Sequence, residues 1–359
     1  MILSLFIAGV WQPSGLRRAV HGLTLLVLLS VSLSAAELRW EKLSPIPNAL
    51  GVAGSFVGVS GEALLVAGGA SFPNKKPWEG GTKVWHDEVF ALEKPGGEWR
   101  LVGKLPVPLA YGVAITHQRG LICFGGSVTD HHHGSAIVLR WVKGRLETEL
   151  LLGMPEPRAN LCGALVGNTV YVCGGAATPD ATNASQSLFS MNLTPKRPGW
   201  RKLEPLPGPG RVFATAGAHD GSFYVFGGAA LHPGADGKPL REWLRDAWRY
   251  TPGKGWKRLA DLPRAAVAAP SPAPMVNGRL LLLGGDDGAQ VNTPPDQHQG
   301  FRRDVLAYDP KRDKWESLGE APFAHVTTTA VMWKNRIVIP SGEVRPGVRS
   351  PEVWSAITR

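Results

Sequence analysis

The chain has 359 residues, of which 43% are hydrophobic and only 19% are charged, and it contains 44 Gly and 30 Pro. This balance excludes an intrinsically disordered chain, which needs few apolar residues and many charges. Frequent turn residues predict a globular all-β protein with many short strands. The net charge of +10 comes from scattered basic residues, which argues against nucleic-acid binding and predicts a mild attraction for anionic ligands.

The first 36 residues differ from the rest of the chain. Arg17 and Arg18 precede an apolar run of 12 residues at 22–33, and Ser34-Ala35-Ala36 offers small residues for cleavage. This layout predicts a signal peptide over residues 1–36 and export to the periplasm or the exterior. The alternative is a membrane anchor, although the apolar run is short of the ~20 residues that span a bilayer. Cleavage would leave no membrane attachment and a net charge of +8, because the leader holds two arginines and no acids.

A glycine doublet recurs through the remainder of the chain at intervals of 49 to 57 residues. The six copies are Gly68-Gly69, Gly125-Gly126, Gly174-Gly175, Gly227-Gly228, Gly284-Gly285 and Ser341-Gly342. Strand-like runs lie on both sides of each copy, and a Trp seven residues before a Pro marks a further strand in five units. Four short strands in each period of about 50 residues are the kelch signature. Residues 37–359 are therefore predicted to form a six-bladed kelch-type β-propeller.

The phase of the repeat predicts how the propeller closes. The strand-like segment at 38–47 precedes the first doublet, and no Trp strand follows the last one. The N-terminal strand should therefore complete the last blade, which removes free sheet edges. The doublets should adopt positive φ angles, which glycine reaches without a Cβ penalty, and the tryptophans should pack between blades.

Three cysteines are too few for a disulfide framework and lack metal-site spacing. A turn at Gly167-Asn168 would place Cys162 opposite Cys173. The pair could form a cross-strand disulfide or remain as two buried thiols. We favour the thiols, because cross-strand geometry strains the bond.

Ligands of propellers bind where loops of several blades converge at the channel mouth, so polar residues at equivalent blade positions are candidates. Alignment after the prolines gives one ring of Asn48, Leu109, Arg158, Arg211, Arg264 and Phe323, and a second of Leu50, Tyr111, Asn160, Phe213, Ala266 and His325. Arg158, Arg211 and Arg264, with Tyr111 and Asn160, predict a site for an anionic organic ligand, because a guanidinium binds a carboxylate through two hydrogen bonds. Alternatively, these arginines bind loop carbonyls.

The last doublet is followed by an unusual loop. Glu343 comes directly after it, Pro346-Gly347 turns the chain, and Arg349 returns six residues later. Such a loop could hold a carboxylate and a guanidinium toward one pocket. The residue types alone favour a surface salt bridge between Glu343 and Arg349.

The segment SGEVRPGVR resembles the Gly-Glu-x-Lys-Pro-Gly-x-Arg loop of the N-acetylneuraminate epimerases, the sialic acid mutarotases, with Arg345 in place of Lys. The resemblance implies that Glu343 and Arg349 are the functional pair. VAGSFVGVSGEALLVAGGASF and LAYGVAITHQRGLICFGG resemble the last two units of that family but come first here, which implies a cyclically permuted branch. The loop with Trp78, Glu79, Trp85 and His86 departs from the family and would line the pocket or cover its rim.

The resemblance implies an isomerase that interconverts the anomers of a small acidic sugar without metal or cofactor. Glu343 would act as general base and then acid, and Arg349, helped by the ring arginines, would hold the sugar carboxylate. The choice of sugar and the oligomeric state stay open.

Two alternatives remain. A kelch propeller can bind a carbohydrate or a protein without chemistry, although the GEVRPGVR segment weighs against this. A copper radical oxidase would need two Tyr, two His and a Cys crosslinked to Tyr, and no suitable Cys-Tyr pairing is evident among the five tyrosines. The adjacent residues His131, His132 and His133 cannot easily all face one ion.

Overall fold

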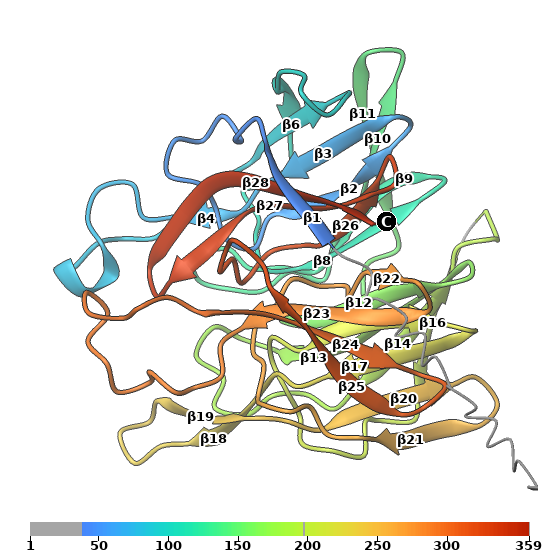
Figure 1. The fold of residues 1–359 in the computed structure, drawn as a ribbon. Helices are drawn as coiled ribbons and strands as arrows, with labels where there is room; N and C mark the ends of the chain where they lie inside the picture. Colours follow the sequence, from blue (N-terminus) through green and yellow to red (C-terminus); the bar gives the residue numbers. More distant parts are fainter. Residues whose placement is uncertain (1–37, 197, 359) are drawn as a thin grey trace, which may run out of the picture. The chain divides into compact units, whose positions relative to one another are not determined.

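The structure, a computed structural model, describes residues 38–196 and 198–358. The predicted signal peptide at 1–36 lies outside the described residues. The described chain forms six four-stranded antiparallel sheets arranged as the blades of a β-propeller (Figure 1). This confirms the predicted all-β, six-bladed fold. No helix within the described ranges has the length and apolar character needed to cross a membrane.

Each blade has four strands. Blade one contains β2 (Phe56–Ser60), β3 (Ala63–Ala67), β6 (Glu88–Leu92) and β7 (Arg100–Lys104). Blade two contains β8 (Val113–His117), β9 (Gly120–Phe124), β10 (Ala136–Val142) and β11 (Arg145–Leu151). Blade three contains β12 (Ala159–Val166), β13 (Thr169–Ala176), β14 (Leu188–Asn192) and β15 (Trp200–Leu203).

The second half of the ring repeats this arrangement. Blade four contains β16 (Thr215–His219), β17 (Ser222–Phe226), β20 (Ala247–Thr251) and β21 (Gly255–Leu259). Blade five contains β22 (Met275–Val276), β23 (Arg279–Gly285), β24 (Arg302–Asp309) and β25 (Lys314–Glu320). Blade six contains β26 (Val331–Trp333), β27 (Arg336–Arg345), β28 (Val348–Thr358) and β1 (Leu38–Leu43). Two hairpins and a short 3-10 helix lie outside the blades: β4 (Ala70–Ser71) with β5 (Val84–Trp85), β18 (Ala229–Pro233) with β19 (Pro239–Trp243), and η1 (Pro77–Glu79).

The N-terminal strand closes the ring. β1 pairs antiparallel with β28 from Leu38 opposite Thr358 to Leu43 opposite Val353, and Figure 1 shows the blue β1 beside the red β28. The same sheet contains β27, which carries Glu343. The predicted closure is therefore confirmed.

The doublets turn the chain sharply in every blade. All twelve doublet residues have φ between +54° and +132°. A Cβ on Gly68 would lie 2.2 Å from the carbonyl oxygen of Leu109 in the next blade, so this position also excludes a side chain. Ser341 replaces a glycine at a φ of 55° and is fixed by its hydroxyl, which accepts from the Val52 N–H at 2.8 Å and lies 2.8 Å from the Ser350 carbonyl oxygen.

The tryptophans connect neighbouring blades. The indole N–H groups of four of them donate to carbonyl oxygens of the preceding blade, in the pairs Trp99 to Ser44, Trp200 to Leu152, Trp256 to Glu204 and Trp315 to Ala260. The Trp200 ring also packs edge-on against Phe124 of blade two at 5.4 Å. The expected packing of tryptophans between blades is confirmed, and the main hydrophobic clusters likewise join residues of adjacent blades.

A closed ring of backbone hydrogen bonds surrounds the central channel. Its members are Gly54, Tyr111, Asn160, Phe213, Ala268 and Thr327. The N–H of each donates to the carbonyl of its equivalent in the preceding blade at 2.7 to 2.8 Å. All six have φ between +54° and +69°, a left-handed conformation that costs a non-glycine residue about 1–2 kcal/mol. The hydrogen bonds of the ring stabilise these strained backbone conformations at the channel mouth.

The ring corrects one part of the sequence alignment. Tyr111, Asn160 and Phe213 do occupy equivalent positions, but the other three members are Gly54, Ala268 and Thr327 rather than Leu50, Ala266 and His325. The ring position lies five residues after the proline in four blades, six after it in blade four and seven after it in the segment that leads into blade one, and the alignment did not keep the five-residue spacing at Ala268 and Thr327.

The cysteine register is as predicted. Cys162 lies opposite Cys173 across the turn at Gly167-Asn168. All three cysteines are free and buried, and burial raises the pKa of the Cys173 thiol to about 12. The favoured alternative of two buried thiols agrees with the structure.

Candidate active site

A cavity of about 300 Å³ opens at the channel mouth, above the ring residues Tyr111, Phe213, Ala268 and Thr327. Its walls come from the segments that follow the doublets of blades one, four, five and six. The volume is at the lower end of the range for small-molecule sites. The narrower channel cavity beneath, about 70 Å³, includes Asn160 and is lined by no Asp, Glu, Lys, Arg or His. Charged groups therefore meet at the mouth.

The residue after each doublet pairs with the segment that enters the blade, and in two blades this residue lines the cavity. Bridges join Glu343 to Val326 and Asp286 to Val267. The same position holds Ala70, Ser127, Ala176 and Ala229 in the other blades. Two adjacent blades therefore present carboxylates where the others present small side chains.

Glu343 and Arg349 lie opposite each other on the hairpin of β27 and β28, which turns at Pro346-Gly347. Glu343 Oε1 accepts a hydrogen bond from the Gly347 N–H at 2.6 Å and one from Arg349 Nη1 at 3.3 Å. Glu343 Oε2 has no hydrogen-bond partner among the described residues. The loop thus directs a carboxylate and a guanidinium into one cavity, with one carboxylate oxygen available.

Arg349 is the more enclosed partner. Its side chain is 5% exposed, against 17% for Glu343. The guanidinium lies over the ring of Phe72 at 4.7 Å, and its Nε is buried without a hydrogen-bond partner in the described chain. Phe72 follows β4 in the insert of blade one, so the contact joins the last blade to the insert of the first.

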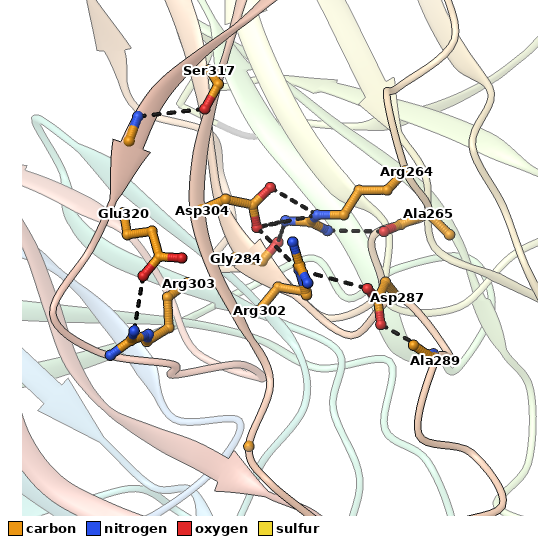
Figure 2. Close-up of polar contacts among 12 residues, drawn as sticks. Arg264, Ala265, Gly284, Asp287, Ala289, Arg302, Arg303, Asp304, Ser317 and Glu320 are labelled. Carbon is orange, nitrogen blue, oxygen red and sulfur yellow. Dashed lines mark hydrogen bonds and ion pairs between the residues drawn. The ribbon is translucent and has the colours of Figure 1, made fainter.

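The predicted ring arginines do not reach this cavity. Arg211 is buried and binds both carboxylate oxygens of Asp246 at 2.8 Å, together with the Gly227 carbonyl at 2.9 Å. Figure 2 shows the corresponding network of Arg264, which contacts Asp304 and the Gly284 carbonyl. In both blades the arginine binds the carbonyl of the first doublet glycine. The partner aspartate lies just before the third strand in blade four and within the third strand in blade five.

Arg158 finds no aspartate at that place, since Ser187 stands there, and it pairs with Glu156 instead. Arg211 and Arg264 therefore match the structural alternative, because each binds a loop carbonyl, whereas Arg158 contacts a carboxylate instead. Of the predicted ring residues Arg158, Arg211, Arg264, Tyr111 and Asn160, only Tyr111 lines the cavity of Glu343. Asn160 lines the channel below.

Two cations that the sequence analysis did not select line the cavity. Lys83 Nζ lies over the ring of Tyr111 at 5.0 Å and over that of Trp85 at 5.3 Å. Arg241 lies over the ring of Phe213 at 5.9 Å. They are carried by β4–β5 and β18–β19, the two hairpins inserted after doublets, which lie on the left in Figure 1. The length of these two inserts was the feature of the sequence that could have pointed to Lys83 and Arg241.

The insert of blade one contributes some residues to the cavity and others to its rim. Trp85 packs against Lys83, and His86 contacts the Ser71 hydroxyl at 2.8 Å. Trp78 is 36% exposed, and the Glu79 carboxylate accepts from the Lys76 N–H at 2.9 Å in the cap of η1. Neither Trp78 nor Glu79 lines the cavity.

Residues 20–147 match the family model of N-acetylneuraminate epimerase. An N-acetylneuraminate epimerase of Yersinia enterocolitica is 32% identical over 225 residues, which are 55% of this chain and 55% of the relative. The chain is similar to N-acetylneuraminate epimerases. One from Yersinia pestis is 29% identical, with 57% and 56% covered, and one from Haemophilus influenzae is 27% identical, with 53% and 54% covered. The resemblance to epimerases is confirmed over about half the length of these relatives, and the cyclic permutation stays a prediction.

Proposed function

We propose that this chain is a mutarotase, an isomerase that interconverts the anomers of an acidic sugar such as N-acetylneuraminate. The observation that carries the proposal is the carboxylate of Glu343 in the cavity, with Oε1 held by two donors and Oε2 free. The names of the similar proteins support the sugar class. The predicted leader supports export as part of the same proposal.

The proposed reaction consists of proton transfers around a reversible ring opening. Glu343 Oε2 takes the proton of the anomeric hydroxyl, the bond between the anomeric carbon and the ring oxygen breaks, and Glu343 then donates the proton to the ring oxygen. The open keto form rotates about its C–C bond, and the steps run in reverse on the other face. Glu343 ends ionised as it began, so no electrons or groups are transferred. General acid–base catalysis of this kind contributes about 10²–10⁴-fold.

The surrounding groups prepare Glu343 for this role. The short hydrogen bond from the Gly347 N–H and the contact from Arg349 are charge-assisted, which fixes the orientation of the carboxylate. A base must lie within hydrogen-bond reach of the proton it removes, and the fixed Oε1 leaves Oε2 as the reacting atom. Residues 346 and 347 build this arrangement by turning the hairpin tightly.

The test is NMR of freshly dissolved N-acetylneuraminate, following the α-to-β anomer ratio with and without protein. Wild type should exceed the buffer rate, and Glu343→Gln should lose about 10²–10⁴-fold while keeping the fold, because an amide cannot accept the proton. Glu79→Gln, on the rim, is the matched control and should keep the wild-type rate. If Glu343→Gln matches wild type, the mechanism is wrong. If no variant exceeds buffer on any acidic sugar, the propeller binds its ligand without chemistry.

A further inference from the structure

Two cations face the cavity without a carboxylate partner. In the described chain, no carboxylate oxygen lies within 4 Å of Lys83 Nζ or the Arg241 guanidinium, whereas Arg349 pairs with Glu343. The other acid of the cavity, Asp286, is engaged by the Trp243 indole N–H at 3.1 Å and the Gly288 N–H at 2.9 Å. Three cations and two acids line the cavity, which leaves one excess positive charge among the described residues.

Both cations are fixed over members of the backbone ring. Lys83 contacts the face of Tyr111 and Arg241 the face of Phe213, and these are ring positions separated only by Asn160. Lys83, a half-buried residue, also lies 5.9 Å from the ring of Phe72, so its ammonium lies near three aromatic faces. Aromatic faces hold a cation without consuming its hydrogen-bond donors in the way a carboxylate would. A partly desolvated ammonium also attracts an anion more strongly than one in open water.

Arg349 is poorly placed to be the main anion anchor. Its side chain is 5% exposed, one terminal nitrogen already contacts Glu343, and its face is covered by Phe72. These contacts suit a residue that orients Glu343.

We propose that Lys83, assisted by Arg241, binds the carboxylate of the substrate, and that Arg349 is a positioning residue for Glu343. The choice of an acidic sugar rests on the proposed function, but anion binding at Lys83 does not require catalysis. In a 2-keto sugar acid the carboxylate is attached to the anomeric carbon. Binding it at Lys83 would hold the anomeric hydroxyl in the cavity that Glu343 lines.

The test compares binding of N-acetylneuraminate with binding of its methyl ester, which has the same shape without the charge. For Lys83→Met, affinity for the acid should fall about 10- to 100-fold, as for loss of a hydrogen bond to a charged group, while affinity for the ester changes less than about twofold. Lys83→Arg should restore most of the preference for the acid. Lys75→Met, in the same insert but outside the cavity, is the matched control. Arg241→Met should give a smaller loss in the same direction.

Kinetics separate the two roles. Lys83→Met should raise KM for the acid and spare kcat, whereas Arg349→Met should lower kcat and keep the preference for acid over ester. Unchanged acid affinity in Lys83→Met, or equal loss for acid and ester, would overturn the inference. If Glu343→Gln works at the wild-type rate while Lys83→Met still loses affinity for the acid, the proposed mechanism is rejected and the anion site is kept.

Discussion

Blades four and six each contain an arginine paired with a carboxylate, and the two pairs differ in how completely they are satisfied. Arg211 makes two 2.8 Å hydrogen bonds to Asp246, and the Asp246 carboxylate also accepts from the Trp248 indole at 2.6 Å. In blade six, Arg349 makes one 3.3 Å hydrogen bond to Glu343, and the other carboxylate oxygen has no hydrogen-bond partner in the described part of the chain. The same two side-chain types therefore form a closed structural pair in one blade and an open pair in the other.

The difference has a physical origin. The Arg211 side chain is fully buried, and a buried charge is tolerated only when its hydrogen-bonding groups are satisfied. Desolvation alone would raise the pKa of Asp246, but the hydrogen bonds and charge of Arg211, with the hydrogen bond from Trp248, outweigh it and lower this pKa. An open carboxylate beside a cavity can exchange a proton with a ligand, which a saturated one cannot do.

The largest effect on stability is expected from breaking the closed pair. Arg211→Met leaves Asp246 as a buried, unpaired charge, so the free energy of unfolding should fall by about 3–5 kcal/mol. Denaturant unfolding measures this, with Arg201→Met on the exposed face of β15 as the control that should change little. A loss no larger than that of the control would show that the pair is not structural.

A smaller effect is expected at the equivalent place in blade six. Val326 pairs with Glu343 as Val212 pairs with Ala229, so His325 takes the position of Arg211. Val353 pairs with Pro340 as Ala247 pairs with Phe226, so Glu352 takes the position of Asp246. Burial lowers the pKa of His325 to about 4. Between this value and the usual 6.5 the unfolded chain binds more protons than the folded one, so the free energy of unfolding should decrease as the pH is lowered through that window, by about 3 kcal/mol in full. The slope of unfolding free energy against pH should flatten in His325→Gln but not in His219→Gln, and an unchanged slope in His325→Gln would contradict the assignment.

The smallest effect on stability is expected from opening the pair in blade six. Arg349→Met removes one long hydrogen bond and the contact with Phe72, while the Gly347 N–H still holds Glu343, so about 1 kcal/mol should be lost. Thermal and denaturant unfolding beside Arg211→Met give the comparison. A loss as large as that of Arg211→Met would make Glu343 and Arg349 a structural salt bridge.

The repeat made most of the fold predictable. Doublets and tryptophans recur in phase, and that phase alone placed the N-terminal strand beside the blade of Glu343. The pairing of Cys162 with Cys173 followed from a two-residue turn, since register is fixed once the turn is known.

Only the residues of the candidate site that follow the last doublet closely in sequence were predictable. Glu343 and Arg349 are six residues apart on one hairpin, so local sequence brings them together. The structural role of Arg211 depends on Asp246, 35 residues away, and that of Arg264 on Asp304, 40 residues away. Lys83 and Arg241 lie on inserts that the repeat does not describe, and their approach to Tyr111 and Phe213 depends on how the hairpins fold over the ring.

The most direct test of the distinction between the two pairs is the anomer equilibration rate of Glu343→Gln and Arg211→Met, measured by NMR at a temperature where both are folded. Glu343→Gln should be slower than wild type by about 10²–10⁴-fold with a nearly unchanged melting temperature, whereas Arg211→Met should melt early but keep the wild-type rate per folded molecule. A Glu343→Gln protein that is as fast as wild type, or one that loses stability like Arg211→Met, would contradict the account.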